Sequence, residues 1–116
     1  PSLRHMLQVL LEQDGHAVVA AGDVQSALQQ CQVQLPDLMI VDLMLPIEDG
    51  ETFLREFRRR WRHEEVPVIL LSASSARNDI ARKLGVEASL AKPFFAEDLR
   101  ELVRQLAAQK QSVAAS

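Results

Sequence analysis

Two uninterrupted apolar stretches predict strands that are buried on both faces. The first covers residues 38–41 and stops at Asp42, and the second covers residues 68–71 and stops at Ser72. Continuous apolar runs of this length are typical of parallel sheets, whose strands are covered by helices on both faces. The polar residue that follows each run lies at the carboxyl end of a strand, where open α/β sheets place ligands and chemistry.

Two further strands are predicted from shorter patterns. Residues 88–91 form a short run that ends at Lys92. Residues 16–21 form a valine-containing run between Gly15 and Gly22, and glycines of this kind commonly bound strands. The chain therefore shows four segments that we expect to pair in one sheet.

Between these runs, apolar residues recur three and four positions apart, which indicates helices. The apolar positions of the five predicted helices are Leu3, Met6, Leu7, Leu10 and Leu11; Val24, Ala27, Leu28 and Cys31; Phe53, Leu54, Phe57 and Trp61; Ile80, Ala81 and Leu84; and Leu99, Leu102, Val103 and Leu106. Strands and helices thus alternate with short connections. This order predicts an α/β fold in which helices cover both faces of a parallel sheet.

Capping residues indicate where several helices begin and end. Asp23 is a typical N-cap for the second helix, and Ser74 or Ser75 can start the fourth. Gly85 is expected to end that fourth helix. We expect the third helix to begin after Gly50.

The composition is that of an ordinary globular domain. Of the 116 residues, 47% are hydrophobic and 25% are charged, and this length suits one domain with its own core. We place the domain at residues 1–107 and a helix end or linker at residues 108–116. Cys31 is the only cysteine, which excludes an intrachain disulfide or a thiolate metal cluster and favours a core position.

Charge and hydropathy bear on partners and location. The net charge of −3 gives no reason to expect nucleic acid or an anionic membrane as a partner. No apolar run approaches the ~18 residues of a membrane span, so a cytoplasmic location is the default expectation.

The third predicted helix carries a basic cluster beside its aromatic residues. The cluster consists of Arg55, Arg58, Arg59, Arg60 and Arg62. Arginines beside aromatics can contact nucleic acid. We favour a solvated face instead, because the aromatics have core spacing and nearby glutamates offset the charge.

The three strand ends Asp42, Ser72 and Lys92 are expected to meet at one edge of the sheet. Separately, each has an ordinary explanation as a loop aspartate, a helix-starting serine or a loop lysine. Together they have a common chemistry. A carboxylate can attack a phosphoryl group, an ammonium can balance its oxygens, and a hydroxyl can hydrogen-bond to one of them.

The chain resembles the receiver domains of two-component response regulators. The resemblance lies in VDLMLPIEDG around Asp42, LLSAS around Ser72 and LAKPF around Lys92, and it extends over essentially the whole sequence. It implies that Asp42 is the phosphoacceptor, that Ser72 moves toward the phosphoryl group and that Lys92 contacts it.

The resemblance also implies a fold and further roles. The fold would be flavodoxin-like and doubly wound, with five parallel strands in the order 2-1-3-4-5. Met44 would give a backbone carbonyl to Mg²⁺, and Pro46 and Gly50 would shape the loop after the acceptor. The Lys92–Pro93 peptide bond would be cis, a form that is accessible before proline.

The sequence departs from this family at its start. The family begins with a strand and an acidic pair that binds Mg²⁺, and here both would lie upstream of Pro1. We expect a fragment of a longer chain, or another segment that takes the place of the first strand. Mg²⁺ is expected for the full-length protein, whereas Asp42 and Met44 alone give too few ligands for its six-oxygen shell.

A second departure concerns signal output. Ser89 occupies the position where the family usually carries an aromatic switch residue, and the segment 72–85 looks slightly short. Both lie on the face of the fourth helix, fifth strand and fifth helix, through which the family contacts partners and could form a homodimer. The change at Ser89 puts the usual coupling in question.

Three functions remain in competition at this stage. We favour a phosphorylation switch in which a histidine kinase or phosphotransfer protein phosphorylates Asp42. The alternative is a pseudo-receiver, a phosphorylation-independent protein-interaction module. A phosphohydrolase is disfavoured because Met44 stands where such an enzyme needs a proton-donating aspartate, so we expect a signalling domain rather than an enzyme.

Overall fold

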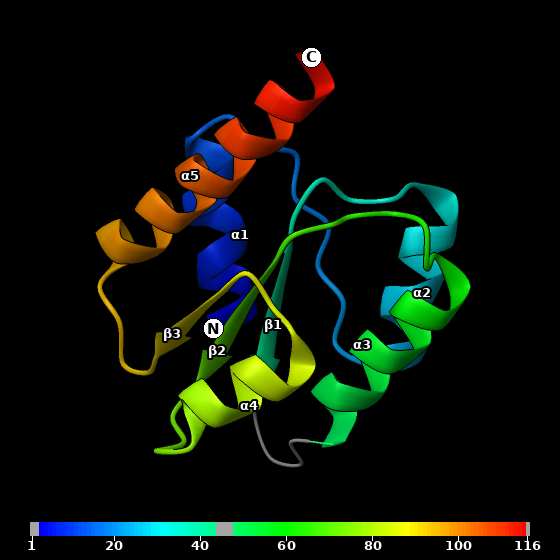
Figure 1. Ribbon diagram of the computed structural model, residues 1–116. Helices are drawn as coiled ribbons and strands as arrows, with labels where there is room; N and C mark the ends of the chain where they lie inside the picture. Colours follow the sequence, from blue (N-terminus) through cyan, green and yellow to red (C-terminus); the bar gives the residue numbers. More distant parts are fainter. Residues whose placement is uncertain (1–2, 44–47, 116) are drawn as a thin grey trace. The chain divides into compact units, whose positions relative to one another are not determined.

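The computed structural model describes residues 3–43 and 48–115 of the chain (Figure 1). They fall into two compact units, Pro1–Leu35 and Pro36–Ser116. No helix among the described residues combines the length and apolar character needed to cross a bilayer.

The first unit contains two of the predicted helices, α1 (Leu3–Gln13) and α2 (Val24–Val33). The backbone of Gly15, at φ 92, turns the chain after α1 in the left-handed region that glycine tolerates. Asp23 caps α2 as predicted, because its Oδ1 accepts a hydrogen bond of 2.8 Å from the Ser26 amide. Cys31 is buried in α2, and this burial raises the pKa of its thiol, which confirms its assignment to the core.

The strand predicted at residues 16–21 does not form. This segment has no strand assignment, and Val19 within it is 69% exposed. A strand exists only when its backbone groups pair with a neighbour, and none of the described strands pairs with this segment. The glycine boundaries and the valines therefore did not suffice to predict a strand.

The second unit is a parallel three-stranded sheet with three helices. The strands are β1 (Met39–Leu43), β2 (Val68–Ser72) and β3 (Ala88–Ala91), and the helices are α3 (Glu48–Arg60), α4 (Arg77–Leu84) and α5 (Ala96–Ala115). The strand order is β1-β2-β3, which is the order predicted for the last three strands. Figure 1 shows the strands side by side, with α3 and α5 flanking them.

The central strand β2 is the centre of this unit. All five of its residues are buried, and Ile69, Leu70 and Leu71 have no exposed surface. Its neighbours pair with it on both edges, and β1 adds the buried side chains Met39, Val41 and Leu43. The apolar sides of α3 and α5 supply further buried side chains, which are Phe53, Leu54, Phe57, Leu99, Val103 and Leu106. The continuous apolar run thus predicted its position correctly.

Helix α3 begins earlier than predicted, because Gly50 lies inside its first turn and not before it. A Cβ atom at position 50 would overlap the Leu43 side chain and stand 3.4 Å from Val41 Cγ1. Glycine therefore lets the start of α3 approach β1 closely. The second loop residue implied by the resemblance, Pro46, lies outside the described residues.

The basic cluster on α3 has the character of a solvated face. Arg59 donates two hydrogen bonds of 3.0 Å to Glu56, and these bonds lower the pKa of Glu56. On the opposite side, Phe57 packs between Phe53 and Trp61, with ring centroids 6.0 and 5.1 Å away. The aromatics therefore belong to the core and its edge, as their spacing predicted.

Helix α4 begins at Arg77, later than Ser74 or Ser75. Instead of capping the helix, Ser74 forms a turn before it, in which its Oγ accepts a 3.0 Å hydrogen bond from the Ala76 amide. The helix ends at Gly85 as predicted, with φ 64 in the left-handed region. Helix α5 continues to Ala115, and the domain boundary at residue 107 stays a prediction.

We expect Leu71→Ala to lower the free energy of unfolding by about 2–5 kcal/mol, because it removes buried methyl groups and leaves a cavity. Ile69→Val, a milder change, should cost about 0.5–1.5 kcal/mol. Urea unfolding followed by circular dichroism measures both. The exposed control Val19→Ala should stay within about 0.5 kcal/mol of the wild type, and a β2 variant as stable as this control would contradict the central role of β2.

The Asp23 cap should make α2 sensitive to acid. Hydrogen bonds from Ser26 lower the pKa of Asp23 in the folded chain, so its contribution to stability is present above the unfolded pKa and is lost as pH falls through the lower folded pKa. Asp23→Ala should lower the melting temperature at neutral pH, whereas Asp23→Asn should keep the cap and lose the acid dependence. Melting curves between neutral and acidic pH check this, and equal acid sensitivity in all three proteins would contradict it.

Candidate functional site

The parallel register brings the three predicted site residues to one edge of the sheet. Ser72, the last residue of β2, pairs with Leu43 on one side and with Ala91 on the other. Asp42 lies one residue before the end of β1, and Lys92 directly follows β3. Because all three strands run in the same direction, their carboxyl ends meet there.

Lys92 and Asp42 form an ion pair across the end of β2. The Lys92 Nζ contacts the Asp42 Oδ1, and the two side chains are 22% and 26% exposed. The strands that carry them are separated by β2, so their backbones stand roughly 10 Å apart at the usual strand spacing. The long lysine stem spans this gap, which brings together two residues that are 50 positions apart in the sequence.

The Asp42 Oδ1 is sheltered but incompletely satisfied. It is buried and accepts no hydrogen bond within the part of the chain that is described, although it lies in contact with the Lys92 ammonium. A carboxylate oxygen has two lone pairs and can accept more than one hydrogen bond, so this oxygen has unused capacity to accept or to react. This is an unusual arrangement for a residue with a purely structural role.

Ser72 connects the sheet edge to the segment that leads to α4. Its side chain is 1% exposed, and its Oγ accepts a hydrogen bond of 3.1 Å from the Ser74 amide. Its carbonyl accepts a second bond, of 3.0 Å, from the Lys92 amide. The hydroxyl hydrogen remains able to donate to an oxygen at the sheet edge.

Ser74 was missed as a site-related residue at the level of sequence. The signal was nonetheless present, because a backbone amide two residues after a serine is the usual partner of its hydroxyl. The sequence placed Ser74 in a helix start, whereas the structure places it between Ser72 and α4.

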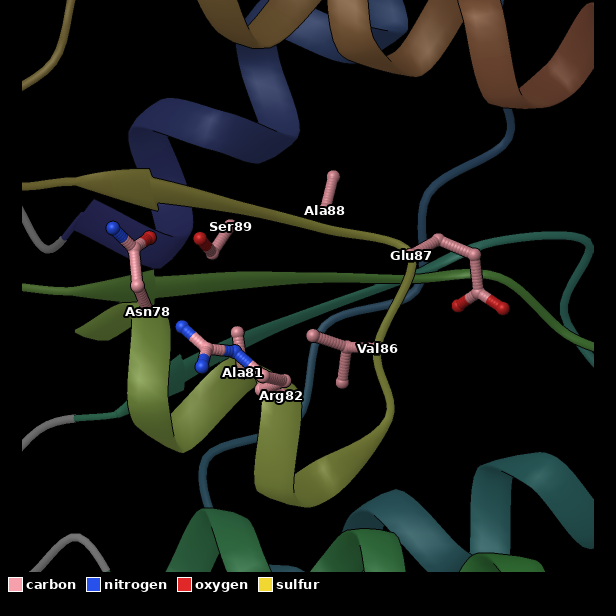
Figure 2. A pocket seen from close by; sticks show the side chains of 7 residues that line it. All are labelled: Asn78, Ala81, Arg82, Val86, Glu87, Ala88 and Ser89. Atoms are coloured by element: carbon pink, nitrogen blue, oxygen red, sulfur yellow. The ribbon is translucent and has the colours of Figure 1, made fainter. Parts of the chain in front are cut away.

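Ser89, at the predicted switch position, lines an open cavity of about 380 Å³ between α4 and β3. Figure 2 shows Asn78 and Arg82 of α4 beside Ser89 of β3 around this cavity. The remaining lining residues are Ala81, Val86, Glu87 and Ala88. A serine thus leaves space where a ring would fill it, while its role in switching stays a prediction.

The described residues do not make a complete Mg²⁺ site. No group of three acidic, histidine or cysteine side chains comes together in the parts of the chain that the structure covers. Asp42 is one oxygen donor, and the carbonyl predicted from Met44 lies outside the described residues. Mg²⁺ binds six oxygen ligands, and Asp42 alone supplies too few of them.

Ser72→Ala should destabilise the turn before α4. The change leaves the Ser74 amide without its acceptor, which we expect to cost about 1 kcal/mol because the bond is partly buried. Hydrogen exchange measured by NMR should show faster exchange of the Ser74 amide. Ser89→Ala is the matched control on β3, and a Ser74 amide that exchanges equally fast in both variants would contradict this role of Ser72.

Comparison with known proteins shows the family. The family model described as the response regulator receiver domain matches residues 1–104. The chain is 35% identical over 115 residues to the response regulator Rre1 of Synechocystis sp., covering 97% of this chain and 50% of that protein. It is 39% identical over 108 residues to the virulence transcriptional regulatory protein PhoP of Salmonella typhimurium, covering 90% and 46% of the two chains.

Solved structures agree with this result. The chemotaxis protein CheY4 of Vibrio cholerae is similar at a TM-score of 0.78 with 25% identity, over 90% of this chain and 88% of that one. A receiver domain of a signal transduction histidine kinase from Syntrophus aciditrophicus gives a TM-score of 0.76 with 26% identity, over 90% and 81%. The chain spans about half the length of the curated relatives it matches. With its parallel sheet and its three strand-end side chains, this chain belongs to the receiver domains of two-component response regulators.

Proposed function

We propose that the chain acts as a phosphorylation switch in which Asp42 accepts a phosphoryl group from the phosphohistidine of a histidine kinase or phosphotransfer protein. The observation that carries this proposal is the ion pair between Asp42 and Lys92 at the sheet edge. It combines a sheltered nucleophile with a cation at the position where phosphoryl charge would develop.

The proposed reaction exchanges one bond for another. An Asp42 carboxylate oxygen attacks phosphorus, the phosphorus–nitrogen bond of the donor breaks, and the donor imidazole keeps the bonding electron pair. Lys92 loses its contact with the free carboxylate and balances the charge of the phosphoryl oxygens. The Ser72 hydroxyl donates a hydrogen bond to one of these oxygens.

One further feature of the site supports this assignment of roles. Lys92 is tied to Ser72 through a backbone hydrogen bond of 3.0 Å, so cation and hydroxyl are held by the same pair of strands. Preorganised groups of this kind stabilise developing charge without further rearrangement. The described residues do not complete a metal site, and the role of Mg²⁺ in the natural protein stays a prediction.

The second candidate is a pseudo-receiver that binds partners without phosphorylation. It is favoured by the open cavity at Ser89, where the family usually carries an aromatic switch residue. In either case we propose the face formed by α4, β3 and α5 as the surface for partners or for a second copy of the chain.

A phosphorylation assay separates the two candidates. The natural protein that carries this sequence is incubated with acetyl phosphate and Mg²⁺, and its intact mass is measured. We expect an adduct of one phosphoryl group that is absent in Asp42→Asn, because an amide cannot replace the attacking carboxylate. Asp37→Asn, at an exposed position, is the matched control and should keep the adduct.

Either of two results would reject the switch. Wild-type protein without any adduct would favour the pseudo-receiver. An adduct that persists in Asp42→Asn would place the phosphoryl group on another residue.

A further inference from the structure

Helix α4 is held loosely along its length. None of its eight residues is buried, and its N-cap, Ala76, provides no side-chain cap. An element with so little buried surface has a low local stability. It packs against β3, and hydrogen bonds that involve side chains connect the segments at both of its ends.

The C-terminal end of α4 is fixed by an arginine from another helix. Arg58 of α3 donates from Nη1 to the Leu84 carbonyl and from Nη2 to the Gly85 carbonyl, the latter at 3.2 Å. The last carbonyls of a helix have no partner within it and carry partial negative charge. One planar guanidinium therefore satisfies two of them and contributes a favourable charge at the same point.

The N-terminal end of α4 is connected to the candidate site. The Ser72 Oγ accepts from the Ser74 amide at 3.1 Å, and the Ser74 Oγ accepts from the Ala76 amide at 3.0 Å. The Ser74 carbonyl also accepts from the Arg77 amide at 3.2 Å. Any rotation of the Ser72 side chain thus changes the first of three consecutive bonds that lead into α4.

We propose that Arg58 is a positioning residue that makes the C-terminal end of α4 a fixed pivot, so that a signal from Ser72 moves only the N-terminal end. This inference rests on the proposed function. When Ser72 rotates to bring its hydroxyl to a phosphoryl group on Asp42, its Oγ moves away from the Ser74 amide, so that bond breaks and the turn before α4 loosens. The held end at Gly85 converts this local change into a tilt of the helix.

The tilt would act on the cavity at Ser89. Asn78 and Ala81, from the first five residues of α4, line this cavity opposite Ala88 and Ser89 of β3. A helix that pivots at Gly85 changes the width of the cavity most at Asn78, which is farther from the pivot. The chain would then signal through the gap between α4 and β3 without an aromatic residue at position 89.

The first test measures the pivot in the unmodified natural protein. The Gly85 and Val86 amides donate to the Arg82 and Ala81 carbonyls, and they report on fraying of this end. Arg58→Gln should speed their exchange about five-fold in NMR hydrogen-exchange experiments, as expected for the loss of exposed charge-assisted hydrogen bonds. Arg58→Lys, with a single ammonium group, should give an intermediate result.

The matched control is Arg59→Gln, which removes a neighbouring arginine whose partner is Glu56 on the same helix. It should leave the Gly85 and Val86 amides at the wild-type rate. Equal exchange rates in Arg58→Gln and Arg59→Gln would overturn the pivot.

The second test follows the signal. After treatment with acetyl phosphate and Mg²⁺, with the adduct on Asp42 verified by mass, wild-type exchange should change at residues 73–80 and not at 84–88. In Arg58→Gln the changes should extend through 84–88. If the adduct forms and the exchange changes in the wild type are centred on residues 84–88, the pivot is wrong but the proposed function stands. If no adduct forms, the proposed function is wrong, and with it the proposed movement of Ser72.

Discussion

The complete burial of β2 is the constraint on which the second unit depends. This strand pairs with a parallel neighbour on each edge and is covered on both faces, so a shift of its register by one residue would turn its apolar side chains to the wrong layers. Its register in turn fixes where β1 and β3 end. The positions of Asp42 and Lys92 relative to each other are therefore set by the packing of Ile69, Leu70 and Leu71, none of which is exposed.

The ion pair at this edge is better explained by chemistry than by stability. A pair of charges that is only about a quarter exposed loses much of its hydration, and apolar residues of similar size would serve the fold at least as well. Among the described residues, the site nevertheless keeps a carboxylate oxygen beside the lysine that accepts no hydrogen bond. Such an arrangement is useful where a group that binds later, such as a phosphoryl group, forms new bonds with the carboxylate oxygen and the lysine.

The elements around the site differ in how firmly they are held. Helix α3 packs three buried side chains, and Gly50 lets it approach β1 closely. Helix α4 buries none; it packs on β3 and has hydrogen bonds that involve Arg58 at one end and the Ser72–Ser74 turn near the other. A firmly packed helix thus contacts one end of a less firmly packed helix, and such a difference in local stability is what the proposed movement of α4 requires.

The sequence by itself determined those features whose causes are local. The continuous apolar runs that end at Asp42 and Ser72 identified β1 and β2, and Asp23 and Gly85 identified a helix start and a helix end. Three motifs around strand ends were also sufficient to indicate the family and the candidate site residues. In each case, a short stretch of chain carries its own signal through periodicity, capping or the backbone freedom of glycine.

Only the tertiary structure decided features that depend on a distant partner. Residues 16–21 have the residue types of a strand but pair with none of the described strands, and Gly50 lies inside α3, where a Cβ atom would overlap the Leu43 side chain. The same holds for the Lys92 contact with Asp42 and for the bonds from Arg58 to the end of α4. Pairing, close approach and long-range ion pairs involve two segments at once, and their energies appear only when the fold brings both segments together.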